Sequence, residues 1–170
     1  MLTSIFIVLA RAIHVVSGVV WAGGIFLMAI VIVPLVARHG AEGAGRWLGM
    51  AGRRTGLAVA TSAPLAILSG MYLFATLHPH DQSAGGVVLK TGAAAALLSA
   101  AVGVLFSRTA GRRLAQLTQP SAQQAAPSPE AAREMAALRT RIAVSARVAA
   151  ALLGVTVLAM ATYRYASAVL

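Results

Sequence analysis

Cysteine is absent from this chain of 170 residues, and charged residues are scarce. The lack of thiols excludes disulfides, iron–sulfur clusters held by cysteine and thiolate zinc sites. Charged residues make up 11% of the sequence, whereas a soluble domain has roughly 25%. Hydrophobic residues make up 59%. These proportions indicate an integral membrane protein.

Acidic residues are the rarest charged type, and all of them lie outside the long apolar runs. This placement argues against a carboxylate-driven pump or transporter, which needs such groups inside the membrane. The formal net charge of +10 is of the sign that suits nucleic acid. The arginines cluster between the apolar runs, however, as the positive-inside rule describes. We therefore expect contact with membrane lipid and no binding of nucleic acid.

Four apolar runs are long enough to cross about 30 Å of hydrocarbon as helices. They cover about residues 4–36, 57–77, 86–106 and 142–166. Helices are expected because an open sheet cannot satisfy its backbone in lipid. The sequence thus predicts an all-α integral membrane protein, a four-transmembrane-helix bundle forming a single domain over residues 1–170. The third run contains TGAAAALLSAAVG, whose small residues favour close approach of helices.

Arginine positions predict the orientation of this bundle. The connections Arg38–Arg54 and Arg108–Arg141 carry clustered arginines, whereas the N-terminus and the turn HPHDQSAG carry none. The first two are therefore expected in the cytoplasm and both termini outside, as in a multi-pass protein of a bacterial inner membrane. Residues 107–130 include QPSAQQAAPSPE and are expected to form a flexible cytoplasmic loop. Ser128 and Pro129 then begin a helix that can continue into the fourth span.

This topology brings ionisable residues from all four runs to the outer half of the bundle. Such groups are costly in hydrocarbon and usually mark a function or a buried partner. Lys90 is the only lysine of the chain. It either reaches the outer headgroups with its long side chain or acts as a neutral ligand or base. The members of this set are Arg11, His14, His78, His80, Lys90 and Arg164.

One face of the first helix carries Arg11, His14, Gly18 and Trp21, at spacings of three and four residues. An imidazole in a span is a ready ligand for a metal or a haem iron. Gly18 would let a flat macrocycle approach the backbone, and Trp21 would pack on its edge. The plainer interpretation is that the glycines serve helix packing and that His14 hydrogen-bonds a neighbouring helix. The residues alone leave both open.

Two runs resemble known families. RAIHVVSGVVWAGGIFLMAIVIVPLV resembles the first helix of the HemJ-type protoporphyrinogen oxidases and of the CopD-like copper-resistance proteins, through His14, Trp21 and Gly23. VVLKTGAAAALLSAAVG resembles the lysine-bearing third helix of the HemJ type, with Lys90 in the matching place. The resemblance implies a four-helix bundle with a b-type haem, in which His14 and Lys90 form the functional pair.

We therefore expect haem b near the outer face, with His14 as an axial ligand. Lys90 or His78 would be the second ligand, and Lys90 is also the candidate catalytic amine. Arg11 and Arg164 would pair with the haem propionates. The expected activity is electron transfer or oxidation of a small redox substrate such as a tetrapyrrole, with a quinone as candidate electron acceptor.

Two other functions stay open at this stage. Copper uptake or resistance of the CopD-like kind would use His14, His78 and His80, although the soft cysteine ligands and paired methionines that select Cu(I) are missing. A non-catalytic subunit would instead pack into a homo-oligomer or a larger membrane complex, with the small-residue third run at the interface.

Overall fold

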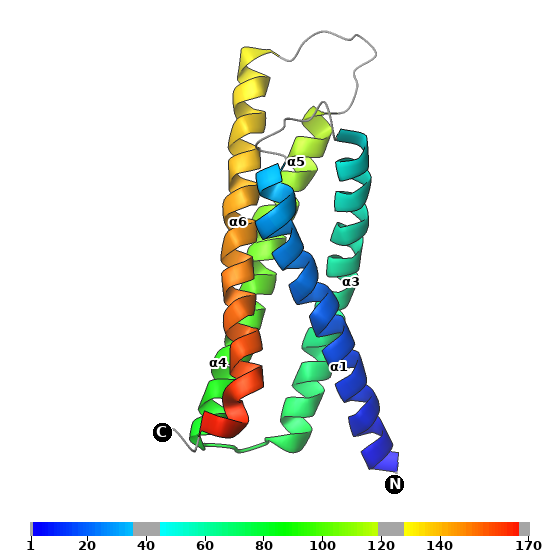
Figure 1. The fold of residues 1–170 in the computed structure, drawn as a ribbon, viewed down its shortest axis with the longest axis vertical. Helices are drawn as coiled ribbons and strands as arrows, with labels where there is room; N and C mark the ends of the chain where they lie inside the picture. The colour runs from blue at the N-terminus through cyan, green and yellow to red at the C-terminus, as the bar shows by residue number, and fades with distance from the viewer. Residues whose placement is uncertain (1, 36–44, 119–127, 167–170) are drawn as a thin grey trace.

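The computed structural model describes residues 2–35, 45–118 and 128–166, with side chains from Thr3 and, in the second range, from Arg54 onward. Every element in these ranges is helical (Figure 1). Helix α1 (Leu2–Leu27) continues into the π-helical turn η1 (Met28–Ile32). The other elements are α3 (Gly45–Leu77), α4 (Ala84–Val102), the π-helical η2 (Gly103–Arg108), α5 (Thr109–Leu117), α6 (Pro129–Thr162) and the 3₁₀ turn η3 (Tyr163–Tyr165).

Four of the continuous helical stretches are long and apolar enough to cross a membrane, which confirms the sequence prediction of four membrane-length helices. They are Thr3–Leu35, Arg54–Leu77, Ala84–Leu117 and Pro129–Tyr165. Large apolar side chains on their outer surfaces are exposed, including Val19, Leu68, Leu105 and Leu158. A soluble monomer rarely exposes so continuous an apolar surface.

The expected flexible connection is helical over much of its length. Residues 109–117 form α5, whereas the sequence predicts a flexible loop over 107–130. Helix α6 begins at Pro129, where the Ser128 hydroxyl accepts a hydrogen bond from the N–H of Ala131 at 3.2 Å. This start, and the unbroken continuation toward residue 162, agree with the sequence. Residues 119–127 lie outside the described residues.

Helices α4 and α6 pack antiparallel along a row of small residues. Ser99 donates to the carbonyl oxygen of Ala149 at 3.1 Å, and Thr156 donates to that of Gly92 at 3.0 Å. A Cβ atom on Gly92 would lie only 2.7 Å from the Cβ of Ala159. Gly92 therefore allows the two backbones to approach closely, as small residues do between membrane helices.

The four helices meet around Trp21. Helix α1 packs chiefly on α3, and α4 packs chiefly on α6, while α3 and α4 touch sparingly. The core between these two pairs consists of Trp21, Ala22, Ala66, Ala96 and Leu153. Figure 1 shows that the N-terminal end of α1 lies well apart from the end of α6. The two pairs are joined by this core and, further toward the other end of α1, by Ala29 of η1, which packs on Ala146 and Ala150 of α6.

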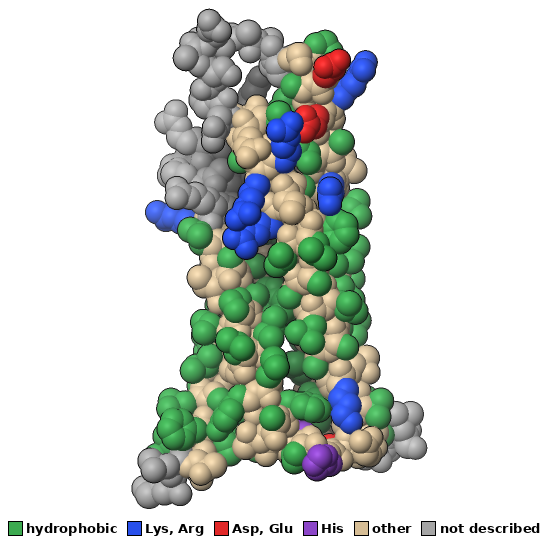
Figure 2. Space-filling model, turned by 180° about the vertical axis from the view of Figure 1, so that it is seen from behind, with side chains coloured by type: hydrophobic (Ala, Val, Ile, Leu, Met, Phe, Trp, Pro, Cys, Tyr) green, Lys and Arg blue, Asp and Glu red, His purple; other side chains and the backbone are tan. Residues whose placement is uncertain are grey.

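The two ends of the bundle differ in charge. Figure 2 shows most of the Lys and Arg side chains on this face gathered over one half of the molecule, and one of them beside a histidine at the opposite end. We call the end with α5 and the start of α6 the arginine end. The other, with the turn 78–83 and η3, is the histidine end. We call the row of small residues between α4 and α6 the seam. The seam and the core around Trp21 determine where the helices, and with them the residues of each end, lie.

Candidate functional site

His14 lies between α1 and α3, with its ring against the backbone of α3. Its Nδ1 atom is 2.8 Å from the carbonyl oxygen of Ala66 and 3.5 Å from the hydroxyl of Ser69. Because a carbonyl oxygen can only accept, Nδ1 carries the proton of this hydrogen bond. In the neutral ring the lone pair is therefore on Nε2.

Gly70 provides the surface on which this ring rests. A Cβ atom at position 70 would lie 2.8 Å from Cε1 and 3.1 Å from Nδ1 of His14. Both distances are shorter than ordinary contact between carbon atoms, which is about 3.5–4.0 Å. Ala66 and Gly70 are one turn apart and share a face of α3. A glycine at position 70 is thus what allows the imidazole to reach the Ala66 carbonyl.

The other ring nitrogen of His14, Nε2, differs from Nδ1 in its surroundings. Within the described residues Nε2 has no hydrogen-bond partner, and those residues contain no buried side-chain nitrogen or oxygen left without one. The half-buried ring therefore keeps Nε2 accessible. One turn further along α1, the Cβ position of Gly18 has nothing within 4 Å. Histidines that bind metals almost always donate their other N–H to a carbonyl or carboxylate, and His14 has this arrangement.

The remaining members of the α1 face have separate environments. Trp21 is 5% exposed and packs in the core with Ala66 and Leu153. Its ring fills the centre of the bundle between His14 and the arginine end. Arg11 is exposed and makes no hydrogen bond or ion pair with the part of the chain that the structure describes. Its guanidinium group is thus available to a ligand or to lipid.

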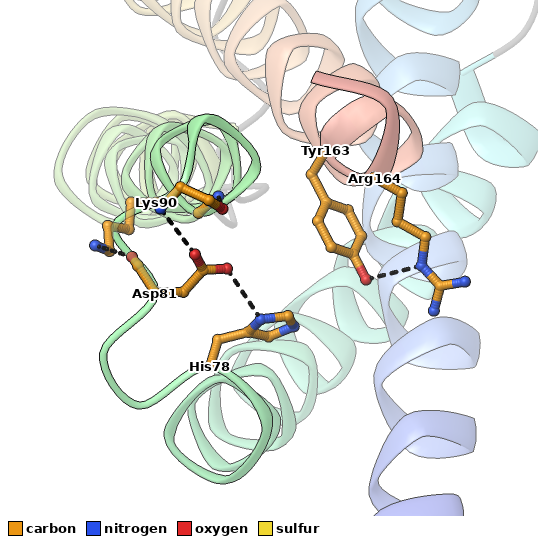
Figure 3. A network of polar contacts seen from close by, with 7 residues as sticks. His78, Asp81, Lys90, Tyr163 and Arg164 are labelled. Carbon is orange, nitrogen blue, oxygen red and sulfur yellow. Dashed lines mark hydrogen bonds and ion pairs between the residues drawn. The ribbon is translucent and has the colours of Figure 1, made fainter. Parts of the chain in front are cut away.

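A second group of polar side chains, which we call the end cluster, lies at the histidine end (Figure 3). Lys90 Nζ donates to the carbonyl oxygen of Asp81 at 2.7 Å, and His78 Nδ1 is 3.4 Å from Asp81 Oδ2. The Tyr163 ring meets His78 edge-on, with centroids 5.8 Å apart. Arg164 Nε donates to the Tyr163 hydroxyl at 3.1 Å. The end cluster therefore ties together the end of α3, the start of α4 and η3.

Asp81 organises the turn between α3 and α4. Its Oδ1 accepts from the N–H of Ser83 at 2.9 Å, and the Ser83 hydroxyl caps α4 by accepting from the N–H of Gly86 at 3.1 Å. The hydroxyl and the N–H of Ser83 lower the pKa of Asp81 below its ordinary value of 3.8, and His78 lowers it further. Asp81 is therefore a carboxylate at neutral pH and holds His78 in place.

The structure brings together His78, Lys90 and Arg164, but it does not join them to His14. No hydrogen bond or ion pair links His14 to any of the three across residues 2–35, 45–118 and 128–166. These ranges also hold no group of three His, Cys, Asp or Glu side chains that could bind a metal ion. A copper site made by His14, His78 and the exposed His80 is thus not assembled among them. A haem iron, by contrast, can be held through one imidazole of the protein.

Several residues around His14 are not among those that the sequence singles out. Ala66, Ser69 and Gly70 contact its ring from α3. The sequence does indicate one of them, Gly70. A glycine in a helix interior costs about 1 kcal/mol of stability relative to alanine, so its presence points to a local packing requirement. Arg147 was also not singled out, although it is a charged residue inside the expected fourth span.

Comparison of the chain with protein-family models, with curated protein sequences and with solved structures finds no match. The resemblance of two helices to the HemJ-type and CopD-like proteins therefore stays a prediction. His14 and the residues around it are the basis for a proposed function.

Proposed function

We propose that this chain is a multi-pass membrane protein that binds one b-type haem through His14. Its role would be electron transfer or the oxidation of a small redox substrate, such as a tetrapyrrole. The proposal depends on one observation: His14 donates through Nδ1 to the Ala66 carbonyl, while Nε2 has no hydrogen-bond partner among the described residues. Such a hydrogen bond fixes the tautomer and the orientation that an axial ligand needs.

The exterior of the bundle supports the membrane placement. Exposed apolar side chains occur on all four long helices, for example Val16, Leu68, Leu97 and Leu158. The arginine end would face the cytoplasm by the positive-inside rule. Both termini would then lie on the outer side, in the orientation expected for a bacterial inner membrane. His14 and the end cluster would be in the outer half.

The residues around His14 have distinct proposed roles. A bound haem would supply a one-electron iron couple. Ala66 and Gly70 would hold the His14 ring in its plane, and Trp21 would exclude water from the arginine side. Arg11 would approach the propionates from the same face of α1. The two Nη atoms of Arg164 also keep their protons for a carboxylate, but Arg164 lies in the end cluster, apart from His14, and its pairing with a propionate stays a prediction from the sequence.

The end cluster limits the choice of a second axial ligand. Lys90 would have to release the Asp81 carbonyl, and His78 would have to leave Asp81 and Tyr163. We therefore propose that His14 is the only protein ligand in the resting state. The role of Lys90 as a second ligand or catalytic amine is supported by the family resemblance alone.

Optical spectra of the purified protein test this proposal. The wild type, expressed with sufficient haem, should show a Soret band and sharp bands on reduction. His14→Gly should lose the bound haem, because no other imidazole is held against α1 by the residues that the structure describes. Added imidazole should restore the Soret band of His14→Gly, since it can occupy the vacated ligand position.

His80→Ala is the matched control, because it removes an exposed histidine outside the site. Its spectrum should equal that of the wild type. Lys90→Gln should also keep its haem, since Lys90 is not a resting-state ligand in this proposal. A wild type that stays colourless after haem supplementation, or a His14→Gly variant with an unchanged spectrum, would refute the haem site. Stoichiometric copper in a colourless protein would favour the CopD-like alternative.

A further inference from the structure

Helices α4 and α6 each carry a long uncharged stretch that is bounded by basic residues. Arg147 and Arg164 are about 25 Å apart along α6 and η3, and Lys90 and Arg108 are about 27 Å apart along α4 and η2, at 1.5 Å per residue. No charged residue lies between the members of either pair. The hydrogen bonds from Thr156 to Gly92 and from Ser99 to Ala149 place the two stretches side by side and staggered, so that Arg108 is near the level of Arg141. Each stretch is close in length to the hydrocarbon thickness of about 30 Å.

Both helices extend beyond this uncharged slab at the arginine end. Helix α6 continues from Arg147 to Pro129 for about 27 Å, and the chain continues from Arg108 to Leu117 for about 14 Å. The Nε of Arg113 lies 2.7 Å from Glu134 Oε1, so α5 packs beside this extension of α6. The α5–α6 hairpin therefore projects out of the hydrocarbon layer into the aqueous phase.

The arginines of this end differ in their distance from the slab. Arg108 and Arg141 lie near one level, because Arg141 covers the Phe106 ring and Ser107 contacts Ser145 at 2.8 Å. Arg147 lies about 9 Å from Arg141 along α6, on the side of the hydrocarbon layer. Arg112 lies about 6 Å beyond Arg108, and Arg133 about 12 Å beyond Arg141. The distance of Arg133 exceeds the Debye length of about 8 Å at physiological ionic strength. Arg108, Arg141 and Arg147 are therefore better placed than Arg112 and Arg133 to interact with headgroups.

The arginines at the edge have no acidic partner in the described part of the protein. Arg147 is exposed on the face of α6 opposite the core, beside the exposed Val144 and Val148. Arg141 lies over the ring of Phe106, 5.2 Å from its centroid, and Phe106 is itself 44% exposed. A guanidinium group at the edge of the hydrocarbon layer is costly unless an anion pairs with it. The described residues do not supply that anion, and the phosphate of a lipid headgroup at this level can.

We propose that Arg108, Arg141 and Arg147 form a headgroup-binding rim for the phosphates of anionic phospholipids. The planar guanidinium group matches phosphate with two parallel hydrogen bonds. The rim surrounds the point at which α4 and α6 leave the hydrocarbon layer, so bound headgroups would fix the depth of the bundle. This inference depends on the membrane placement proposed above and is independent of haem binding by His14.

Native mass spectrometry of the full chain in detergent, titrated with phosphatidylglycerol or phosphatidylcholine, tests the rim. The wild type should prefer phosphatidylglycerol. Arg141→Gln with Arg147→Gln should reduce this preference roughly twenty-five-fold, because each arginine near a headgroup contributes about a fivefold effect. Arg112→Gln with Arg133→Gln removes the same charge about 6 Å beyond Arg108 and about 12 Å beyond Arg141, and should reduce the preference much less.

The other outcomes would overturn the proposal. Equal losses in both double variants would indicate a diffuse field or an acidic protein partner on the hairpin, and no loss in either would exclude a role for the rim. Displacement of phosphatidylglycerol by inorganic phosphate, but not by sodium chloride at equal ionic strength, would point to a free phosphate as the ligand. Should the glutamine pair fail to fold, Arg141→Lys with Arg147→Lys keeps the charge and should retain most of the preference. Loss of the preference in that well-folded lysine pair would contradict the rim.

Discussion

The two nitrogens of the His14 ring have different partners, and this decides what the residue can do. Nδ1 donates to the backbone of a neighbouring helix, which is the structural role that the sequence analysis offers for His14. Nε2 has no such partner among the described residues. A structural role for one nitrogen and ligand binding by the other are therefore compatible. The hydrogen bond of the first nitrogen orients the second, as in many metal sites.

Gly70→Ala tests the geometry at this residue. The new methyl group would push the ring away from α3 and weaken the bond to Ala66, which is worth about 0.5–1.5 kcal/mol. We expect a loss of stability of about 1–2 kcal/mol once the steric clash is added. Nitrogen NMR of the haem-free protein should show less of the Nδ1-protonated form of His14. Unfolding in detergent gives the stability.

Gly56→Ala is the matched control for this variant. It lies on the same helix, and nothing is within 4 Å of its Cβ position. Helix propensity alone should stabilise it by up to about 1 kcal/mol. If Gly70→Ala were as stable as Gly56→Ala and had the same His14 tautomer, Gly70 would not support the ring. Because the protein carries no haem in this experiment, the result does not depend on the proposed function.

The sequence predicts the α1 face of the site but not the α3 face. Arg11, His14 and Trp21 repeat at helical spacing, so their common face can be read directly. Which side of α3 meets His14 depends on how the two helices cross. Helix α3 is apolar over most of its surface, and apolar periodicity does not distinguish a lipid-facing side from a packed one. Ala66 and Gly70 could therefore be identified only in three dimensions.

The α4–α6 pair shows what holds two elements together when both are apolar. Lipid removes most of the hydrophobic drive for helices to associate, so close packing and hydrogen bonds across the seam take its place. Ser99 and Thr156 each donate to a carbonyl oxygen of the opposite helix. The small residues of the third run thus have the packing role that the sequence predicts for them.

Gly92→Val should separate α4 from α6. The valine Cβ would lie 2.7 Å from the Cβ of Ala159. Each Cβ is bonded directly to its backbone, so the clash can be relieved only if the two helices move apart. Overpacking of this kind costs about 1–3 kcal/mol. Thermal melting in detergent should fall clearly below that of Gly103→Val, the control, where nothing lies within 4 Å of the Cβ position. Equal melting temperatures would show that the seam is not tightly packed.

Helix α5 shows the limit of hydropathy as a guide to element length. Apolar runs mark the part of a helix that suits hydrocarbon, and polar residues 109–117 fall outside it. The helix continues because its inner side packs on α6: Ala110 is 2% exposed, and Arg113 pairs with Glu134. This stabilisation comes from a partner distant in sequence, so local composition cannot reveal it.

At the scale of the whole molecule, the sequence predicts the number and type of long helices but not their pairing. The association of α1 with α3 and of α4 with α6, joined around Trp21, follows from shape. Exposed and buried positions are both apolar here, so composition carries little information about which helices touch. The relative depth of the charged residues becomes visible only when the helices are aligned, and it is the basis of the hydrocarbon slab and projecting hairpin that we propose.

Single-cysteine labelling can locate this slab directly, because the natural chain has no cysteine to react in the background. Maleimide reagents react with the thiolate, which forms in water and not in hydrocarbon. Ala137→Cys on the hairpin should react only from the cytoplasmic side of membrane vesicles, and His80→Cys only from the outer side. Val155→Cys, midway between Arg147 and Arg164 and 46% exposed on the bundle surface, should react only after detergent is added. Rapid labelling of Val155→Cys in intact vesicles would show that this surface faces water, and labelling of Ala137→Cys and His80→Cys from the same side would contradict the four-span topology.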